Sequence, residues 1–116
     1  MVVRSLAKVR LTDAEINALR DAVDEVAQSH EVRWRAIHVF GSRTDLAKKG
    51  GDIDLFVEIH PKLGVDIFAL KRRIRQAIEA RLGEQKLDIV IDDGNADLGA
   101  FGDFIKKEAR ALWTNS

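Results

Sequence analysis

The chain has 116 residues, of which 46% are hydrophobic and 33% charged, the composition of an ordinary globular protein. A chain of this length buries roughly two thirds of its unfolded surface, which suffices for one core and favours a single domain over residues 1–116. Nineteen basic residues balance nineteen acidic ones, which disfavours general nucleic-acid binding, and the lack of cysteine excludes a disulfide scaffold, a thiolate metal site and a cysteine nucleophile.

The first half of the chain predicts one helix followed by two strands. Residues 12–15 have the spacing of a capping box, and apolar residues then recur every three or four positions, which predicts a helix over residues 13–28. Residues 33–40 are rich in β-branched and aromatic side chains and stop at Gly41-Ser42, so we expect a strand that ends in a tight turn. A short helical segment follows this turn, and residues 52–59 form the next predicted strand.

The second half repeats the alternation of helix and strand. Apolar residues recur at helical spacing over residues 67–82, with Gly83 as a natural stop, and residues 86–91 predict a third strand. A turn is expected at 92–95 and a last helix at 101–113, with four residues directed inward: Phe104, Ile105, Ala109 and Leu112. The order predicts an α/β fold in which helices cover one face of a small mixed sheet of three or more strands.

Three aspartates share one face of the predicted sheet. Side chains alternate along a strand, so Asp52 and Asp54 lie opposite the apolar face of the second strand, and Asp88 does the same in the third. If these two strands are neighbours, the three carboxylates converge on the face that the helices leave uncovered.

A cluster of carboxylates requires protonation or a cation, because like charges a few ångströms apart repel. Oxygen-only ligands favour a hard divalent ion, with Mg²⁺ first and Mn²⁺ second. The competing interpretation is that Asp52 and Asp54 merely occupy the solvated side of a strand, and the two aspartates alone do not separate these alternatives.

The loop between the first two strands favours the metal interpretation. Gly41-Ser42 offers backbone N–H groups and a hydroxyl to an anion such as phosphate. An anion-binding turn and a metal-binding strand then lie within fourteen residues of the chain. The same connection carries positive charge at Arg43, Lys48 and Lys49, and Gly50-Gly51 follows directly before Asp52.

Three separated motifs resemble those of the minimal nucleotidyltransferases in the DNA polymerase beta superfamily: Gly41-Ser42-Arg43, Asp52-Ile53-Asp54-Leu55 and Leu87-Asp88-Ile89-Val90. The resemblance implies the polymerase beta-like nucleotidyltransferase fold. It also implies that the Gly-Ser-Arg turn binds the nucleotide and that the three aspartates are catalytic ligands of two Mg²⁺ ions. Thr44 stands where the family often has Ala, and Gly51 where it often has Ser, which bears on loop geometry and substrate fit.

The resemblance further implies an activity and a partner. Small members of this family are antitoxin halves of toxin–antitoxin pairs, which implies transfer of AMP from ATP to a tyrosine of an all-helical HEPN toxin in a hetero-oligomer. The alternative is a non-catalytic antitoxin that neutralises its partner by stoichiometric contact. No apolar run approaches the length of a membrane span, so a soluble cytoplasmic protein is expected.

Several other polar residues have simpler interpretations. His38 lies within the first predicted strand, which favours a packed or half-exposed structural histidine over a metal ligand. Glu58 is expected at a solvated strand end, and His60 is expected to be solvated. The long helix carries a basic face that is either solvated or a partner surface: Lys71, Arg72, Arg73, Arg75 and Arg81.

Overall fold

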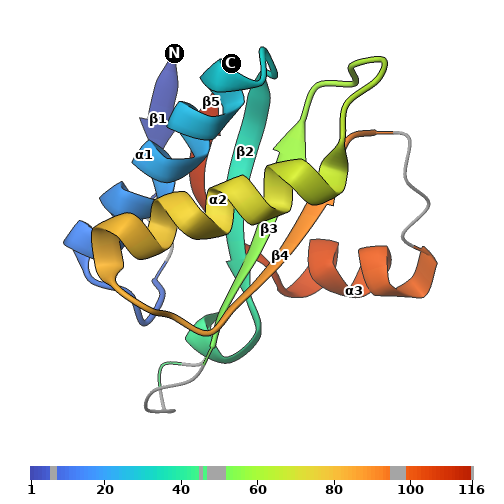
Figure 1. Ribbon diagram of the computed structural model, residues 1–116. Coiled ribbons are helices and arrows are strands. Elements are labelled where there is room, and N and C mark those ends of the chain that lie inside the picture. Colours follow the sequence, from blue (N-terminus) through green and yellow to red (C-terminus); the bar gives the residue numbers. More distant parts are fainter. Residues whose placement is uncertain (6–7, 45, 47–51, 95–98, 116) are drawn as a thin grey trace.

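The computed structural model describes residues 1–5, 8–44, 46, 52–94 and 99–115. These residues form an α/β fold with one five-stranded mixed sheet and three α-helices (Figure 1). The strand order is β1-β5-β2-β3-β4, with β3 and β4 parallel and all other neighbours antiparallel. None of the helices in these ranges is long and apolar enough to cross a membrane. The elements are β1 (Val2–Arg4), α1 (Asp13–Ser29), β2 (Trp34–Phe40), the 3₁₀ helix η1 (Gly41–Thr44), β3 (Ile53–Ile59), α2 (Ile67–Leu82), β4 (Leu87–Asp92), α3 (Gly99–Glu108) and β5 (Arg110–Asn115).

The main core lies between the sheet and the pair α1 and α2, which cover one face of it (Figure 1). The predicted capping box begins α1, since the Glu15 amide donates to the Thr12 hydroxyl and the Thr12 amide donates to the Glu15 carboxylate. The predicted alternation of β3 is also confirmed, because Ile53, Leu55 and Val57 are fully buried in this core. The two long helices and three strands therefore follow the sequence pattern closely.

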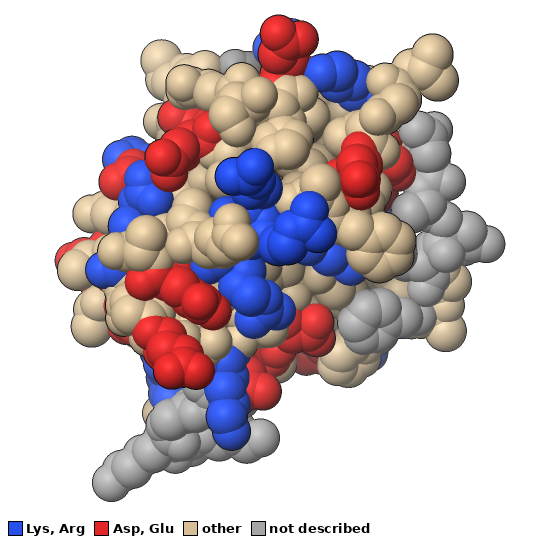
Figure 2. All heavy atoms as spheres, in the orientation of Figure 1, with Lys and Arg blue, Asp and Glu red and all other residues tan. Residues whose placement is uncertain are grey.

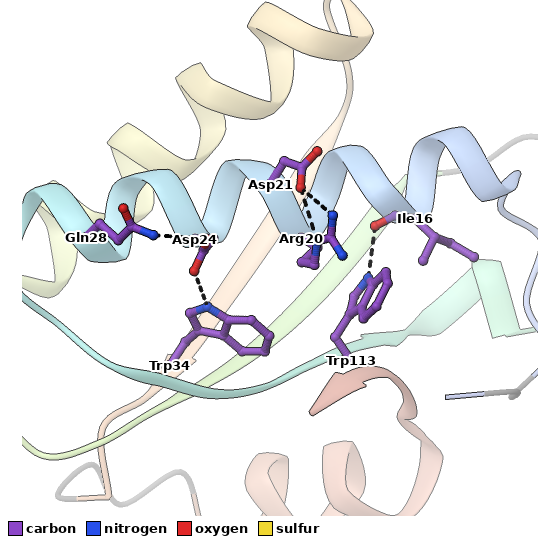
Figure 3. A network of polar contacts seen from close by, with 7 residues as sticks. All are labelled: Ile16, Arg20, Asp21, Asp24, Gln28, Trp34 and Trp113. Atoms are coloured by element: carbon purple, nitrogen blue, oxygen red, sulfur yellow. Dashed lines mark hydrogen bonds and ion pairs between the residues drawn. The ribbon is translucent and has the colours of Figure 1, made fainter. Parts of the chain in front are cut away.

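Two tryptophans fix α1 to the sheet (Figure 3). The indole of Trp34 donates to the Asp24 carboxylate at 3.1 Å, and the indole of Trp113 donates to the main-chain oxygen of Ile16, also at 3.1 Å. The guanidinium carbon of Arg20 lies 4.6 Å from the centre of the Trp113 ring, a cation–π distance. Both rings thus bury apolar area without leaving an unpaired N–H group.

The third helix packs against the opposite face of the sheet. Ile105 of α3 forms a second apolar cluster with Phe40 of β2 and Phe56 of β3, and Phe56 is only 2% exposed. The prediction that helices cover one face alone is therefore wrong. The physical reason is the pair of phenylalanines, which are too large and apolar to remain on a solvated face.

The predicted last helix is also wrong in its second half. The structure ends α3 at Glu108, and Arg110–Asn115 is the strand β5, which lies between β1 and β2 and pairs with both. Leu112 is 1% exposed within the sheet, whereas Phe104, expected to face inward, is 52% exposed on α3. Pairing along both edges of β5 satisfies its backbone polar groups and outweighs the helical spacing of its apolar residues.

Candidate functional site

Three carboxylates meet where β3 and β4 begin. The two strands are parallel neighbours, the condition on which the predicted convergence depends, and Asp54 is the direct register partner of Asp88. Strands in a sheet lie about 4.8 Å apart, so these side chains extend from adjacent points on the same face. Asp52 lies two residues before Asp54, close enough to act on its charge. We call Gly41, Asp52, Asp54 and Asp88 the carboxylate corner.

Asp54 is the member of this group whose charged form is least favoured. Burial raises the pKa of the Asp54 carboxyl above its ordinary value, and the negative charges of Asp88 and then Asp52 raise it further. Asp54 is half-buried, whereas Asp52 and Asp88 are exposed. The corner therefore concentrates negative charge around one carboxylate that is partly withdrawn from water, and a bound cation would relieve this repulsion.

The glycine of the predicted phosphate-binding turn touches the same carboxylate. Gly41 has a φ of +70°, and a Cβ atom at this position would collide with Oδ2 of Asp54 and lie 3.2 Å from its Cγ. Phe40, the preceding residue, is the register partner of Asp54 across the β2–β3 pair. The chain thus brings the main chain of the Gly-Ser turn directly against the central carboxylate, which only glycine allows.

Arg43 has a structural contact that the sequence pattern did not indicate. Its guanidinium Nη1 donates to the main-chain oxygen of Arg10 at 2.8 Å, and the Arg10 amide donates to the Arg43 oxygen at 2.8 Å. The hydroxyl of Thr44 closes η1 by donating to the Gly41 oxygen at 2.7 Å. These contacts hold η1 against the segment before α1. The predicted contributions of the Ser42 side chain and of residues 48–51 lie outside what the structure describes.

The donor set of the corner suits a hard divalent cation. Asp52, Asp54 and Asp88 supply only carboxylate oxygens, the ligands that Mg²⁺ and Mn²⁺ prefer, and their mutual repulsion favours an ion among them. Within the described part of the chain, no three His, Asp or Glu side chains are already arranged as a metal site. Asp52, Asp54 and Asp88 are the residues that would hold such an ion.

Arg75 fixes the start of β4, immediately before Asp88. Its Nη2 donates to the main-chain oxygen of Leu87 at 2.7 Å from a partly buried position on α2. Sequence reasoning placed this arginine only on a basic helix face, because a contact to a strand twelve residues away is not encoded in helical periodicity.

Arg75→Met keeps the apolar stem and removes this hydrogen bond, so we expect the free energy of unfolding to fall by about 1–2 kcal/mol. Chemical denaturation measures the change. Arg73→Met removes an exposed cation from the same helix and should alter stability by less than about 0.5 kcal/mol. An equal loss in both variants would show that the bond to Leu87 contributes nothing.

The chain was compared with known protein families and with curated protein sequences. No model of a known protein family matches the chain, and no curated protein sequence matches it significantly. The function of this chain is therefore inferred from the carboxylate corner and from the motifs that form it.

Proposed function

We propose that this protein is a Mg²⁺-dependent nucleotidyltransferase of the polymerase beta-like fold, which transfers AMP from ATP to a hydroxyl. One observation carries the proposal: the main chain of Gly41 packs against the Asp54 carboxylate, beside Asp88 and Asp52. A turn suited to phosphate and a carboxylate set suited to metal therefore share one corner. Nucleotidyl transfer needs this combination, because a triphosphate and its cation must be held together.

The residues of the carboxylate corner have different roles in the proposed reaction. The backbone of the Gly41 turn binds phosphate oxygens, and Asp52, Asp54 and Asp88 would hold two Mg²⁺ ions, which when bound stabilise charge on the attacking and leaving oxygens. The acceptor oxygen forms a bond to the α-phosphorus, and the bond from that phosphorus to pyrophosphate breaks. Asp88 accepts the proton of the acceptor hydroxyl, and pyrophosphate leaves with the bond electrons.

The proposed acceptor is a tyrosine of an all-helical HEPN toxin, so that the protein acts as an antitoxin. The solvent exposure of Asp52 and Asp88 supports a macromolecular acceptor, because the surface of a partner protein can reach both carboxylates. Such a partner would present a hydroxyl in line with the α-phosphate. A tyrosine of such a toxin is the acceptor that the resemblance to minimal nucleotidyltransferases implies.

Intact-mass measurement tests the transfer. The purified protein is incubated with ATP, Mg²⁺ and the all-helical protein encoded beside it, and we expect the partner to gain the mass of one or more AMP groups. Asp88→Asn should remove this gain, since it removes the proposed proton acceptor. Asp103→Asn makes the same replacement of a carboxylate by an amide at an exposed position on α3, and it should leave transfer unchanged.

A toxin that stays unmodified yet is neutralised equally by the wild type and by Asp88→Asn would overturn the proposal. That result would establish the non-catalytic alternative, in which the protein blocks its partner by contact alone.

A further inference from the structure

We infer that the protein has a second site, which binds a phosphate group through Arg33 and Arg35. It lies on the face of the sheet that carries the carboxylate corner, at the opposite end of the strands. Both arginines line a cavity of about 460 Å³, together with His60 and residues of β2, β3 and β5. Asp54 near the start of β3 and His60 directly after its end are six residues apart, or about 20 Å at the rise of a strand. The cavity is therefore distinct from the carboxylate corner, and the inference does not depend on the proposed transferase activity.

A β-bulge places the arginines on this face. Ile37 and Val39 point into the main core, so strict alternation would direct Arg35 toward the helices as well. The register instead shifts at Arg35, because Trp34 pairs with Ile59 while Ala36 pairs with the adjacent Glu58. The extra residue reverses the phase of the strand, and Trp34 enters the core. Both arginines then line the cavity on the other face.

Hydrogen bonds to neighbouring segments hold the cavity in shape. The His60 amide donates to the Arg33 oxygen at 2.8 Å, which sets the start of the loop after β3 beside this arginine. Lys62 anchors the same loop by donating to the main-chain oxygens of His30 and Glu31 at 2.9 and 3.0 Å, where α1 ends. On the other side, Asn115 donates to the Trp34 oxygen at 3.2 Å. The backbone around both arginines is thus fixed before a ligand arrives.

The charges in the cavity are unbalanced. Neither the Arg33 nor the Arg35 side chain makes a hydrogen bond or an ion pair with any residue in the described ranges. Glu58, the carboxylate among the described lining residues, lies 2.9 Å from Nε2 of His38 and pairs with neither arginine. Two guanidinium groups and one carboxylate therefore line the cavity, and neither guanidinium forms an ion pair with a described residue.

This arrangement favours a phosphate group as the ligand. Guanidinium groups donate pairs of parallel hydrogen bonds to phosphate oxygens, a geometry that a lysine ammonium cannot match. Single-stranded nucleic acid is disfavoured, because no Phe, Tyr or Trp side chain is found among the described lining residues to stack on a base. A phosphate group, free or attached to a small organic molecule or a peptide, satisfies the two arginines directly.

A titration with inorganic phosphate tests the site. It is followed by backbone amide NMR shifts at constant ionic strength, with EDTA present so that no metal bridges phosphate to the carboxylate corner. We expect saturable shifts at residues 33–36, 58–60 and 114–115. The double variant Arg33→Gln with Arg35→Gln should raise the Kd at least about tenfold. Arg33→Lys with Arg35→Lys keeps the charge and should give an intermediate Kd, because the paired donor geometry is lost.

The matched control removes the same charge from another surface. Arg72 and Arg73 are exposed on α2, and Figure 2 shows basic side chains gathered over the region of this helix beside acidic ones. Arg72→Gln with Arg73→Gln should leave the Kd for phosphate within about twofold, since only general charge is altered. Thermal denaturation confirms that each variant remains folded.

Two further titrations identify the source of the phosphate. AMP and a phosphoserine peptide are measured in the same way, and the double glutamine variant should weaken both by the factor found for inorganic phosphate. The ligand with the lowest Kd then indicates whether the site prefers a nucleotide or a phosphorylated protein. The inference is overturned if the shifts do not saturate, or if the wild type and the double glutamine variant have the same Kd.

Discussion

Asp54→Asn is expected to abolish AMP transfer while the metal-free protein becomes more stable than the wild type. The substitution removes a proposed metal ligand, and metal stabilisation of the transition state is worth several kcal/mol, so we expect the rate to fall more than about a hundredfold. The same substitution removes a charge that burial and two neighbouring carboxylates oppose. Transfer assays and thermal denaturation in EDTA measure the two effects separately.

The pH dependence of stability gives this prediction a direction. Since burial, Asp88 and Asp52 raise the pKa of Asp54, the folded protein binds this proton more tightly than the unfolded chain does. Stability is thus lost as the pH rises from the ordinary carboxylate pKa of about 3.9 through the raised pKa of the folded state. In EDTA, the Tm advantage of Asp54→Asn should be largest at neutral pH and shrink toward pH about 3, where both states of the wild type are protonated.

Asp103→Asn is the control for this experiment, because Asp103 is exposed on α3. It should change neither the transfer rate nor the shape of the pH curve. A lower metal-free Tm for Asp54→Asn together with full transfer activity would show that Asp54 is a structural residue and not a ligand.

The parts of the fold that the sequence predicts are those with a local signature. The helix α1 begins with its capping box, and α2 ends at Gly83, as expected. The apolar alternation of β3 and β4 predicts which face is buried, and their pairing brings Asp54 beside Asp88. The capping box, the stop at Gly83 and the alternation depend on residues that are close together in the chain, whereas the pairing of β3 with β4 is a distant contact that the structure adds.

The parts that the sequence does not predict depend on distant contacts. Ile105, Ala109 and Leu112 are spaced as on a helix. The segment from Arg110 is nevertheless a strand, because pairing with its neighbours in the sheet, as Thr114 does with Ala36, stabilises it more than a further turn of helix would. The three-residue strand β1 is too short to show a periodicity, and its partner among the described strands is β5. The bulge at Arg35 is likewise fixed by its neighbouring strand rather than by its own sequence.

The sequence predicts which residues form the carboxylate corner, but it does not predict the contact between Gly41 and Asp54. The sequence places a Gly-Ser turn and three aspartates in order along the chain. That the Gly41 backbone touches the Asp54 carboxylate follows from the register of β2 against β3 and from the positive φ of Gly41, and neither can be read from the motifs.

Gly41→Ala tests this contact, and we expect losses of both stability and transfer for two separable reasons. A φ of +70° costs an alanine about 1–2 kcal/mol, equivalent to a fall in Tm of about 4–8 °C for a chain of this size. In addition, the new Cβ would collide with Oδ2 of Asp54, so the carboxylate must rotate away from its position. Displacing a proposed metal ligand should reduce AMP transfer by more than about tenfold.

Gly64→Ala separates the two reasons. Gly64 has a φ of +78° but no atom within 4 Å of an added Cβ, so this variant carries the backbone strain without a collision. We expect it to lose stability by the strain alone and to keep full transfer. In the Asp54→Ala background, where the carboxylate is absent, the stability cost of Gly41→Ala should fall to that of Gly64→Ala. If Gly41→Ala costs no more than Gly64→Ala in the wild-type background and transfer is retained, the turn does not pack on Asp54, and the main observation behind the proposed function is lost.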